Sequence, residues 1–402
     1  MGRAVHCGLG GLSLGIEPAY LDKTMDKTSA LGQPQFESVR LHILANAARY
    51  FPFLTKPCSI VLKILKPRQN PVVKFQLTDS HHRGASIIAK WAPVYPTNNE
   101  GLTERSHYSR FNSIYGFDRT FRCPSALDFI HGVNVLLTQE EVGTPLVKLL
   151  RPIRQPACSG HLSLSDAVVS SAKWLQAFHR MEPVTWVELD NIWPQIEEST
   201  RNGLIHRPGV REVLGRTLTD AVLRLQDPMQ YKHRSICCAF GAQHRDFGPG
   251  NILVGAQWIT VLDAACNQPG PHIRDVASFC SAFALSAGLR LGCSRWRNSF
   301  IDIFLQTYFG PSGPTHDEKI LLGTFEMSAA LKQLDDNLGK LDGFPPPFRV
   351  VIRQHCKNVY RKVVETIVTD TTHALRSQGG EGRTAVDRAK PWTCGVKIRK
   401  PP

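Results

Sequence analysis

The stretch 239–265 carries the polar side chains best suited to chemistry, and it reads A-F-G-A-Q-H-R-D-F-G-P-G-N-I-L-V-G-A-Q-W-I-T-V-L-D-A-A. His244, Asp246 and Asn251 fall in a polar loop, and Asp263 stands at the end of the second of two apolar runs. These short runs around a Gly-Ala-Gln turn predict a hairpin. Asn251 and Asp263 flank its open end, so we expect them to lie close together, near Asp246.

Converging carboxylate and amide groups are suited to phosphoryl transfer from a nucleotide. Mg²⁺ prefers oxygen ligands, which Asn251 and Asp263 can supply beside phosphate oxygens. Asp246 would then accept the proton of an attacking hydroxyl group. Gly248-Pro249-Gly250 alone indicates only a turn, but the ordered polar set with both apolar runs is a rarer pattern. The sequence therefore predicts a catalytic Asp246, with a nucleotide and Mg²⁺ as cofactors.

The loop also spells H-R-D-x-x-x-x-N, the catalytic-loop pattern of protein kinases. Its form H-R-D-F-G-P-G-N-I-L-V resembles the aminoglycoside phosphotransferase and choline kinase-like family. This resemblance implies an α+β, protein-kinase-like bilobal fold, with a small antiparallel β N-lobe and a larger, mainly helical C-lobe. It also implies ATP-dependent phosphorylation of a small-molecule hydroxyl group, with His244 and Arg245 supporting the loop. Asp275, in R-D-V-A-S-F, resembles a second family aspartate that would hold the loop through hydrogen bonds.

Elements that could hold the nucleotide precede this loop. An amphipathic helix is predicted at 36–50, and β-rich runs at 59–65, 72–77 and 86–91 predict an antiparallel meander. The third run, A-S-I-I-A-K-W, resembles the V-A-I-K strand of kinases. Lys90 would then contact the α- and β-phosphates of the nucleotide, and the alternative is a strand lysine that points to solvent.

An acidic partner would hold Lys90 in place. The predicted helix 99–115 contains Glu104, which we expect to form this pair, and Glu100, which is the second option. The turn 67–70, which would cover the phosphates, has no G-x-G-x-x-G pattern. This departure favours small-molecule kinases over protein kinases and leaves the phosphate-loop contacts unassigned.

A predicted strand at 133–139 leads into E-E-V-G-T-P-L, which resembles the hinge of the family. Backbone groups near Glu140 and Val142 would then contact the adenine edge, and Gly143 and Pro145 fit a bend. Because backbone contacts leave no side-chain signature, the hinge rests on the order of elements alone.

Helices are predicted over most of the remaining chain, at 164–181, 210–225, 275–287, 297–308, 318–341 and 348–375. His179, in the first of them, is interpreted as a packing or hydrogen-bonding residue. In the family the C-terminal helices build the acceptor pocket, and aminoglycoside kinases line it with carboxylates. Four acidic residues are available here, but the net charge of +14 favours a neutral or anionic acceptor; they are Asp317, Glu318, Asp335 and Asp336.

The composition is that of a globular protein of 402 residues with 42% hydrophobic and 20% charged residues. No apolar run is long enough to span a membrane, and no sustained signal-peptide core is present. The 11 cysteines form no C-x-x-C pair, which predicts reduced thiols and a cytoplasmic location. The basic balance is spread along the chain and indicates a solvated surface rather than a nucleic-acid module.

We therefore expect an N-terminal extension at 1–35, an N-lobe at 36–139, a C-lobe at 140–376 and a basic tail at 377–402. The predicted activity is that of a Mg²⁺-dependent small-molecule kinase, with the nucleotide and a hydroxyl acceptor as partners. Three alternatives stay open. One is a pseudokinase or nucleotide-binding regulatory protein, suggested by D-A-A after the loop. Another is a protein kinase, which the missing D-F-G and A-P-E motifs disfavour. The last is a nucleic-acid or membrane-surface binding protein, suggested by the net charge alone.

Overall fold

The computed structural model describes most of the chain, namely residues 34–55, 57–66, 71–92, 100–116, 120–150, 162–193, 205–227, 231, 236–264, 268–291, 294–343 and 345–377. The extension expected at 1–35 and the tail expected at 377–402 lie outside these residues, apart from 34, 35 and 377. The turn 67–70 also lies outside them.

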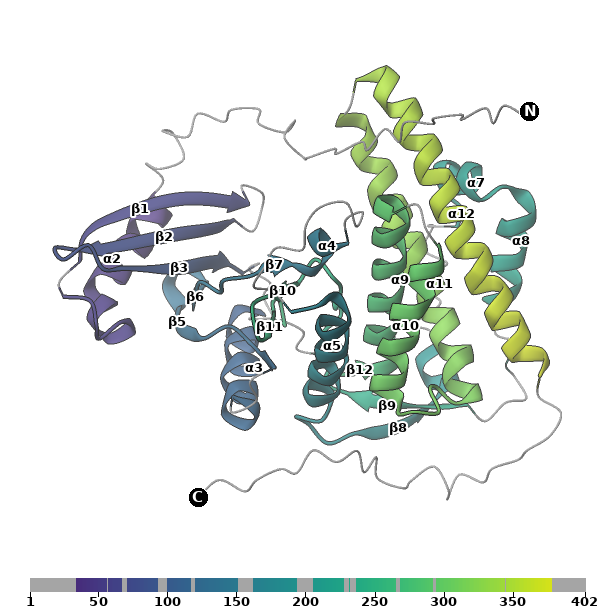
Figure 1. Cartoon of the computed structure of the whole chain (residues 1–402), viewed down its shortest axis with the longest axis horizontal. Helices are drawn as coiled ribbons and strands as arrows, with labels where there is room; N and C mark the ends of the chain where they lie inside the picture. The colour runs from purple at the N-terminus through teal and green to yellow at the C-terminus, as the bar shows by residue number, and fades with distance from the viewer. Residues whose placement is uncertain are drawn as a thin grey trace, which may run out of the picture.

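A five-stranded antiparallel sheet forms one end of the molecule, with the strand order β1-β2-β3-β6-β5 (Figure 1). Its strands are β1 Pro57–Lys66, β2 Val72–Asp79, β3 Gly84–Trp91, β5 Ala126–Ile130 and β6 Val135–Gln139. Buried and more exposed residues alternate along β2, as expected for a sheet with one face against a core. The predicted meander is confirmed.

Two helices flank this sheet. Helix α2, Pro34–Tyr50, buries Val39, Ile43 and Ala47 in one apolar cluster with β2 and β3. Helix α3, Glu100–Tyr115, packs against β5 and β6. A Cβ atom at Gly101 would lie 2.6 Å from the ring of Phe129, so only glycine allows α3 to approach β5 this closely.

Two smaller sheets connect the large sheet to the helices. One has the order β4-β11-β10-β7 and the other β12-β9-β8. In the predicted hairpin, Ile252 faces Val261 and Val254 faces Ile259 in antiparallel register. The strands are β4 Phe121–Arg122, β7 Thr144–Pro145, β8 Thr185–Glu188, β9 Cys237–Gly241, β10 Ile252–Val254, β11 Ile259–Val261 and β12 Gly270–Pro271.

A helical bundle forms the other end of the molecule (Figure 1). Its long helices are α5 Leu164–His179, α9 His272–Leu291, α10 Ser294–Phe309, α11 His316–Lys340 and α12 Pro346–Arg376. Shorter helical segments are η2 His131–Val133, α4 Leu146–Leu149, α7 Pro208–Leu214, α8 Arg216–Leu225 and η4 Leu341–Gly343. The α+β arrangement of a smaller β-rich part and a larger helical part agrees with the prediction.

Two predicted boundaries were wrong for identifiable reasons. The helix expected at 210–225 is two helices, because Gly215 adopts a left-handed φ of 76° between α7 and α8. Val133 belongs to a 3₁₀ turn and not to β6. Among the described residues, no helix is both long and apolar enough to cross a membrane.

Candidate active site

Three charged side chains from distant parts of the chain meet between the large sheet and the hairpin. The ammonium group of Lys90, on β3, lies 2.8 Å from a carboxylate oxygen of Glu104 on α3. It also lies 2.7 Å from Oδ1 of Asp263, just after β11. The predicted Lys90–Glu104 pair is therefore present in the structure, and Asp263 joins it. Glu100 is in the first turn of α3, but its side chain is outside the described residues.

Tyr108 completes this group, which we call the Lys90 cluster: Lys90, Glu104, Tyr108 and Asp263. The Tyr108 hydroxyl donates to the second carboxylate oxygen of Glu104 at 2.6 Å and accepts the backbone N–H of Asp263 at 2.8 Å. Tyr108 was not predicted from the sequence. Its position four residues after Glu104, on the same face of α3, is the signal that could have found it.

The electrostatics of the cluster favour a charged lysine. Burial by itself lowers the pKa of Lys90, but the carboxylates of Glu104 and Asp263 more than offset this, so the pKa lies above its ordinary value. The side chains of Lys90 and Asp263 are 26% and 32% exposed, whereas that of Glu104 is 3% exposed. Glu104 is thus the buried anchor, and the other two groups are within reach of a ligand.

Asp263 holds its position in a strained backbone conformation, with a left-handed φ of 62°. This region disfavours most L-residues, although aspartate and asparagine tolerate it better than others. The hydrogen bond from its N–H to Tyr108 and the hydrogen bond from Leu262 N–H to the Asn251 carbonyl, 2.8 Å long, hold the chain on both sides of the hairpin end. The predicted approach of Asn251 and Asp263 follows from this pairing.

The predicted catalytic loop, residues 244–251, presents Asp246 at the surface. The amide nitrogen of Asn251 donates to Oδ2 and to the backbone oxygen of Asp246, each at 2.9 Å. Because this side-chain nitrogen faces Asp246, the amide oxygen of Asn251 is directed elsewhere and retains its acceptor capacity. Asp246 and Asn251 are therefore brought together as the sequence predicted.

Asp275 lies beneath the loop and is completely buried. Its two carboxylate oxygens accept the backbone N–H groups of His244 and Arg245, at 2.6 and 2.7 Å. Arg245 has a left-handed φ of 66°, and its side chain contacts Gln268 and not Asp246. The bonds to Asp275 thus hold a strained backbone just before Asp246, in the geometry expected for a supporting residue.

A further layer supports Asp275, and together with His179 and Tyr308 it forms what we call the Asp275 cluster. His179 Nε2 lies 3.0 Å from Asp275, and Nδ1 lies 2.7 Å from the Tyr308 hydroxyl. Burial lowers the pKa of His179, although Asp275 opposes part of the shift. The neutral ring therefore donates from Nε2 to the carboxylate and accepts the Tyr308 proton at Nδ1. The interpretation of His179 as a hydrogen-bonding residue agrees with this geometry.

The side chain of His244 links the loop to the hairpin. Its Nε2 donates to the carbonyl of Leu262 at 2.8 Å, one residue before Asp263. Three aromatic rings surround the imidazole, those of Trp174, Phe178 and Phe247. His244 therefore fixes the distance between the segments that carry Asp246 and Asp263, consistent with a supporting role.

The predicted hinge runs along the edge of the hairpin. A Cβ atom at Gly143 would lie 3.0 Å from that of Leu253, so glycine permits the close approach to β10. The Glu140 carboxylate pairs with Lys74 at 2.6 Å, and Val142 is 81% exposed. The prediction that backbone groups near Glu140 and Val142 contact an adenine remains a prediction.

Glu141, next to the predicted hinge residue Glu140, was not predicted as a site residue, and its side chain is 7% exposed. It pairs with Arg122 on β4, and the Arg122 guanidinium lies over the Trp258 ring at 4.3 Å. Burial raises the pKa of Glu141, and Arg122 opposes the rise. These contacts connect the hinge segment to the tip of the β10–β11 hairpin.

The acidic residues considered for an acceptor pocket have other contacts. Glu318 and Thr315 form a reciprocal capping box at the start of α11. Asp335 pairs with Arg207, before α7. Glu318 thus stabilises a helix end and Asp335 a contact between helical segments. These contacts do not indicate that either residue lines an acceptor pocket.

A divalent cation fits the donor set at the hairpin end. Asp263 offers a carboxylate and Asn251 an amide oxygen, both hard oxygen donors of the kind that Mg²⁺ accepts. Within the described part of the chain, no group of three or more His, Cys, Asp or Glu side chains could hold a metal by itself. Two protein donors with nucleotide phosphates and water completing the shell are consistent with this, since Mg²⁺ usually keeps several non-protein ligands.

Comparison with known proteins shows which fold carries this site. Neither the protein-family models nor the curated protein sequences searched give a match. A glucosamine kinase structure, in complex with glucosamine, ADP and inorganic phosphate, aligns with a TM-score of 0.51 over 86% of this chain and 88% of that chain, at 12% identity. The chain has the fold of the protein-kinase-like small-molecule kinases.

Other solved structures with this kinase fold align at lower scores. A choline/ethanolamine kinase family protein from Mesorhizobium loti covers 85% of this chain and 99% of its own, with a TM-score of 0.47 and 13% identity. An aminoglycoside phosphotransferase from Alicyclobacillus acidocaldarius covers 77% and 92%, with a TM-score of 0.46 and 12% identity. The alignment with the glucosamine kinase confirms the bilobal α+β fold implied by the catalytic-loop resemblance.

Proposed function

We propose that this protein transfers the γ-phosphoryl group of ATP to a hydroxyl group of a small molecule, with Mg²⁺ as the metal. The observation that carries the proposal is the Lys90 cluster, in which a strand lysine, a helix glutamate and the hairpin aspartate meet within 2.8 Å. Lys90 and Asp263 are 173 positions apart in the chain. Phosphoryl transfer needs such a positioned cation beside a metal-binding carboxylate.

Lys90 would hold the α- and β-phosphates of the nucleotide. Its ammonium group is charged, and the Lys90 side chain is 26% exposed, so phosphate oxygens can reach it. Glu104, fixed by Tyr108, would keep the ammonium group in place while Asp263 turns toward the metal. The hinge near Glu140 and Val142 would contact the adenine through backbone groups.

Asp263 and Asn251 would hold the magnesium ion. When bound, the ion neutralises charge on the phosphates and orients them for in-line transfer. The residues themselves contribute two oxygen donors on adjacent segments joined by the Leu262–Asn251 hydrogen bond. His244, Arg245 and Asp275 would keep these donors at a fixed distance from Asp246.

Asp246 would orient the acceptor hydroxyl and accept its proton. The carboxylate is exposed, and the Asn251 amide fixes its orientation. A group within hydrogen-bond reach of the reacting hydroxyl contributes about 10² to 10⁴-fold to turnover. The glucosamine kinase that shares the fold acts on a small hydroxylated molecule, which supports an acceptor of this kind.

The division of the chain into an N-lobe at 36–139 and a C-lobe at 140–376 is part of the same proposal.

The deciding experiment measures transfer from labelled ATP with Mg²⁺ across a panel of hydroxyl compounds, including glucosamine, choline, homoserine, nucleosides and aminoglycosides. The expected result is transfer to one class of compound by the wild type. Asp246→Asn should bind nucleotide with wild-type affinity and lose about 10² to 10⁴-fold in turnover. Unchanged turnover in this variant would assign the base to another residue.

A matched control separates the chemistry from a general charge effect. Asp220, on α8, is also exposed and lies 4.0 Å from Arg216, far in sequence from the Lys90 cluster. Asp220→Asn should leave turnover unchanged. ATP binding without transfer to any compound would favour the nucleotide-binding regulatory protein, and absence of ATP binding would contradict the proposal.

A further inference from the structure

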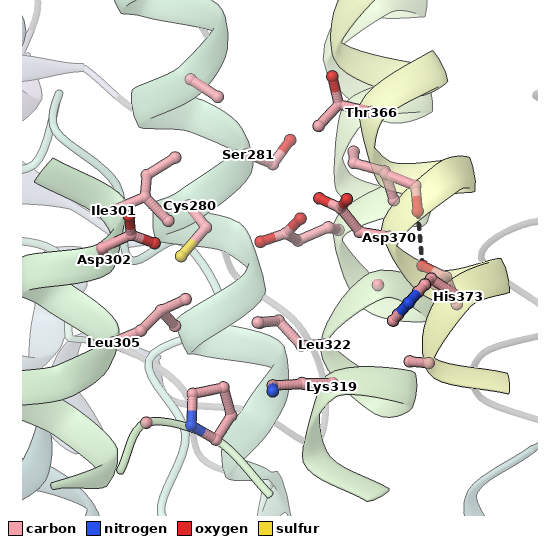
Figure 2. A pocket seen from close by; sticks show the side chains of 18 of the residues that line it. Cys280, Ser281, Ile301, Asp302, Leu305, Lys319, Leu322, Thr366, Asp370 and His373 are labelled. Carbon is pink, nitrogen blue, oxygen red and sulfur yellow. Dashed lines mark hydrogen bonds between the residues drawn. The ribbon is translucent and has the colours of Figure 1, made fainter. Parts of the chain in front are cut away.

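A cavity of about 560 Å³ lies between α9, α10, α11 and α12 of the helical bundle and is open to solvent where Asp302 and Asp370 line it. Its volume is within the range that holds small organic ligands. Figure 2 shows side chains from several helices that point into it, among them Ser281, Asp302 and Asp370. None of the residues assigned above to nucleotide, metal or base lines this cavity.

The cavity and the catalytic loop contact opposite faces of α9. With about 100° of rotation per residue, Asp275, Phe279 and Ala282 share one face of this helix. Phe279 packs against Phe247 of the loop, and a Cβ atom at Gly248 would lie 3.5 Å from that of Ala282. The helix therefore separates the cavity from Asp246.

The α9 residues that line the cavity are Cys280, Ser281 and Ala284, which centre on the other face of the helix. Since α9 stands between them and the catalytic loop, an occupant of the cavity would not present its hydroxyl groups to Asp246. The cavity is distinct from the acceptor site required by the proposed function.

Ser281 places a buried hydroxyl group in the cavity wall. Its side chain is 1% exposed, and among the described residues its hydroxyl has no hydrogen-bond partner. A buried hydroxyl that is left unpaired destabilises the folded state. His316 Nε2, also in the lining, is likewise buried and without a partner in the described part of the chain. Both atoms can accept a hydrogen bond from a ligand.

The charged side chains that line the cavity favour a positively charged ligand. Asp302, Glu326 and Asp370 contribute three carboxylates, and Lys319 contributes one ammonium group. An acidic cavity in a chain of net charge +14 is a local reversal of sign. Figure 2 shows Asp302 and Asp370 on different helices, on two sides of the cavity.

The spacing of the carboxylates excludes a single metal ion among the described residues, because no three acidic or histidine groups converge on one point. Apolar side chains also line the cavity, including Ile301, Leu305, Leu322 and Ile367. A ligand that matches this pattern carries separated ammonium groups joined by methylene segments, with N–H groups to donate to Ser281 and His316.

We propose that the α9–α12 cavity is a binding site for an aliphatic polyamine. The ammonium groups pair with Asp302, Glu326 and Asp370, and the methylene segments pack on the apolar wall. The proposal does not depend on the proposed function, because it concerns the face of α9 that is turned away from the catalytic loop.

Calorimetric titration of the full chain with spermidine, at about 0.15 M salt to screen diffuse surface attraction, tests the site. We expect one saturable site, and weaker binding of butylamine, which carries one ammonium group. The double variant Glu326→Gln with Asp370→Asn should lose at least about tenfold in affinity, since it removes two charge-assisted contacts. Thr366→Lys, which introduces a competing ammonium group, should weaken binding similarly and serves if the double variant does not fold.

Two controls make the result specific. Glu365, also on α12, is paired with Arg361 and does not line the cavity, so Glu365→Gln should bind spermidine as the wild type does. Asp246→Asn should also retain wild-type affinity. Absence of saturable binding, equal affinity in the cavity variants, or loss of binding in Asp246→Asn would overturn the proposal, the last by moving spermidine to the catalytic site.

Discussion

Two carboxylate clusters, both close to the catalytic loop, differ in their access to solvent. In the Lys90 cluster, Lys90 and Asp263 are about one quarter to one third exposed. In the Asp275 cluster, the side chains of Asp275 and His179 are 0% and 3% exposed. The difference indicates a division of roles. Groups that exchange partners with a ligand must be reachable, whereas groups that hold backbone are better buried, where their hydrogen bonds are stronger.

The first prediction removes the reachable carboxylate. Asp263→Ala should lower phosphoryl transfer by about 10³-fold or more, because the metal loses its charged protein ligand. The free energy of unfolding should change by only about 1 kcal/mol, the cost of alanine in a left-handed conformation. Steady-state kinetics and denaturant unfolding measure the two effects.

Asp263→Asn is the matched control for this backbone strain, because asparagine tolerates positive φ. It should unfold as the wild type does and still lose most of the transfer. Wild-type transfer in both variants would remove Asp263 from the proposed metal site.

The second prediction removes the buried carboxylate. Asp275→Asn should lower the free energy of unfolding by about 3 kcal/mol, because an amide replaces an oxygen that accepts a backbone N–H and places a donor against donors. The exposed Asp220→Asn should change it by less than about 0.5 kcal/mol. If urea denaturation gave equal values for both, Asp275 would not be the support of the loop.

The third prediction compares two strand lysines of nearly equal exposure. Lys90→Met should raise the KM for ATP about 10- to 100-fold, since phosphate loses its cation. Lys74 pairs with Glu140 on the same sheet and is 25% exposed, so Lys74→Met is a close control. It should leave the KM nearly unchanged. An equal rise in both variants would mean that the sheet charge as a whole attracts the nucleotide.

The fourth prediction concerns how the free energy of unfolding depends on pH. It uses His272, which stacks on His179 of the Asp275 cluster. Burial and His179, stacked at 4.0 Å, lower the pKa of His272 to about 2. Between that value and the ordinary pKa of about 6.5, the unfolded chain binds a proton that the folded chain does not, so stability falls as pH falls. The slope for one such histidine approaches about 1.4 kcal/mol per pH unit. His179 contributes in the same direction, because its pKa is also lowered.

Unfolding measured between pH 6.5 and 5 tests this sign, above the range where most carboxylates protonate. His272→Gln should remove one histidine's share of the slope while Asp275 and His179 remain in place. A slope unchanged by this substitution would show that His272 is protonated to the same extent in both states.

Much of the site could be predicted because its parts are local in sequence. The hairpin 252–261 has two apolar runs and a turn, and Glu104 falls on the helix after the lysine strand. Side chains that act across elements were harder to find. Tyr108 bridges Glu104 to the backbone of Asp263, 155 positions away, and nothing in the sequence near Tyr108 indicates that contact.

Other features depended on packing that the sequence does not encode locally. The break at Gly215 divides an otherwise continuous amphipathic pattern, because glycine alone can take its φ of 76° without strain. Asp302 and Asp370 lie on different helices, and both are exposed to solvent. Only the arrangement of α10 and α12 brings them to one cavity.

The attachment of the catalytic loop to Asp275 has a consequence for proton exchange with solvent. The amide protons of His244 and Arg245 are bound to a side chain of α9 and not to a neighbouring strand. They can exchange only when α9 separates from the loop, which requires part of the helical bundle to open. A surface loop would thus carry two of the slowly exchanging amides of the protein, with lifetimes that follow the bundle rather than the loop.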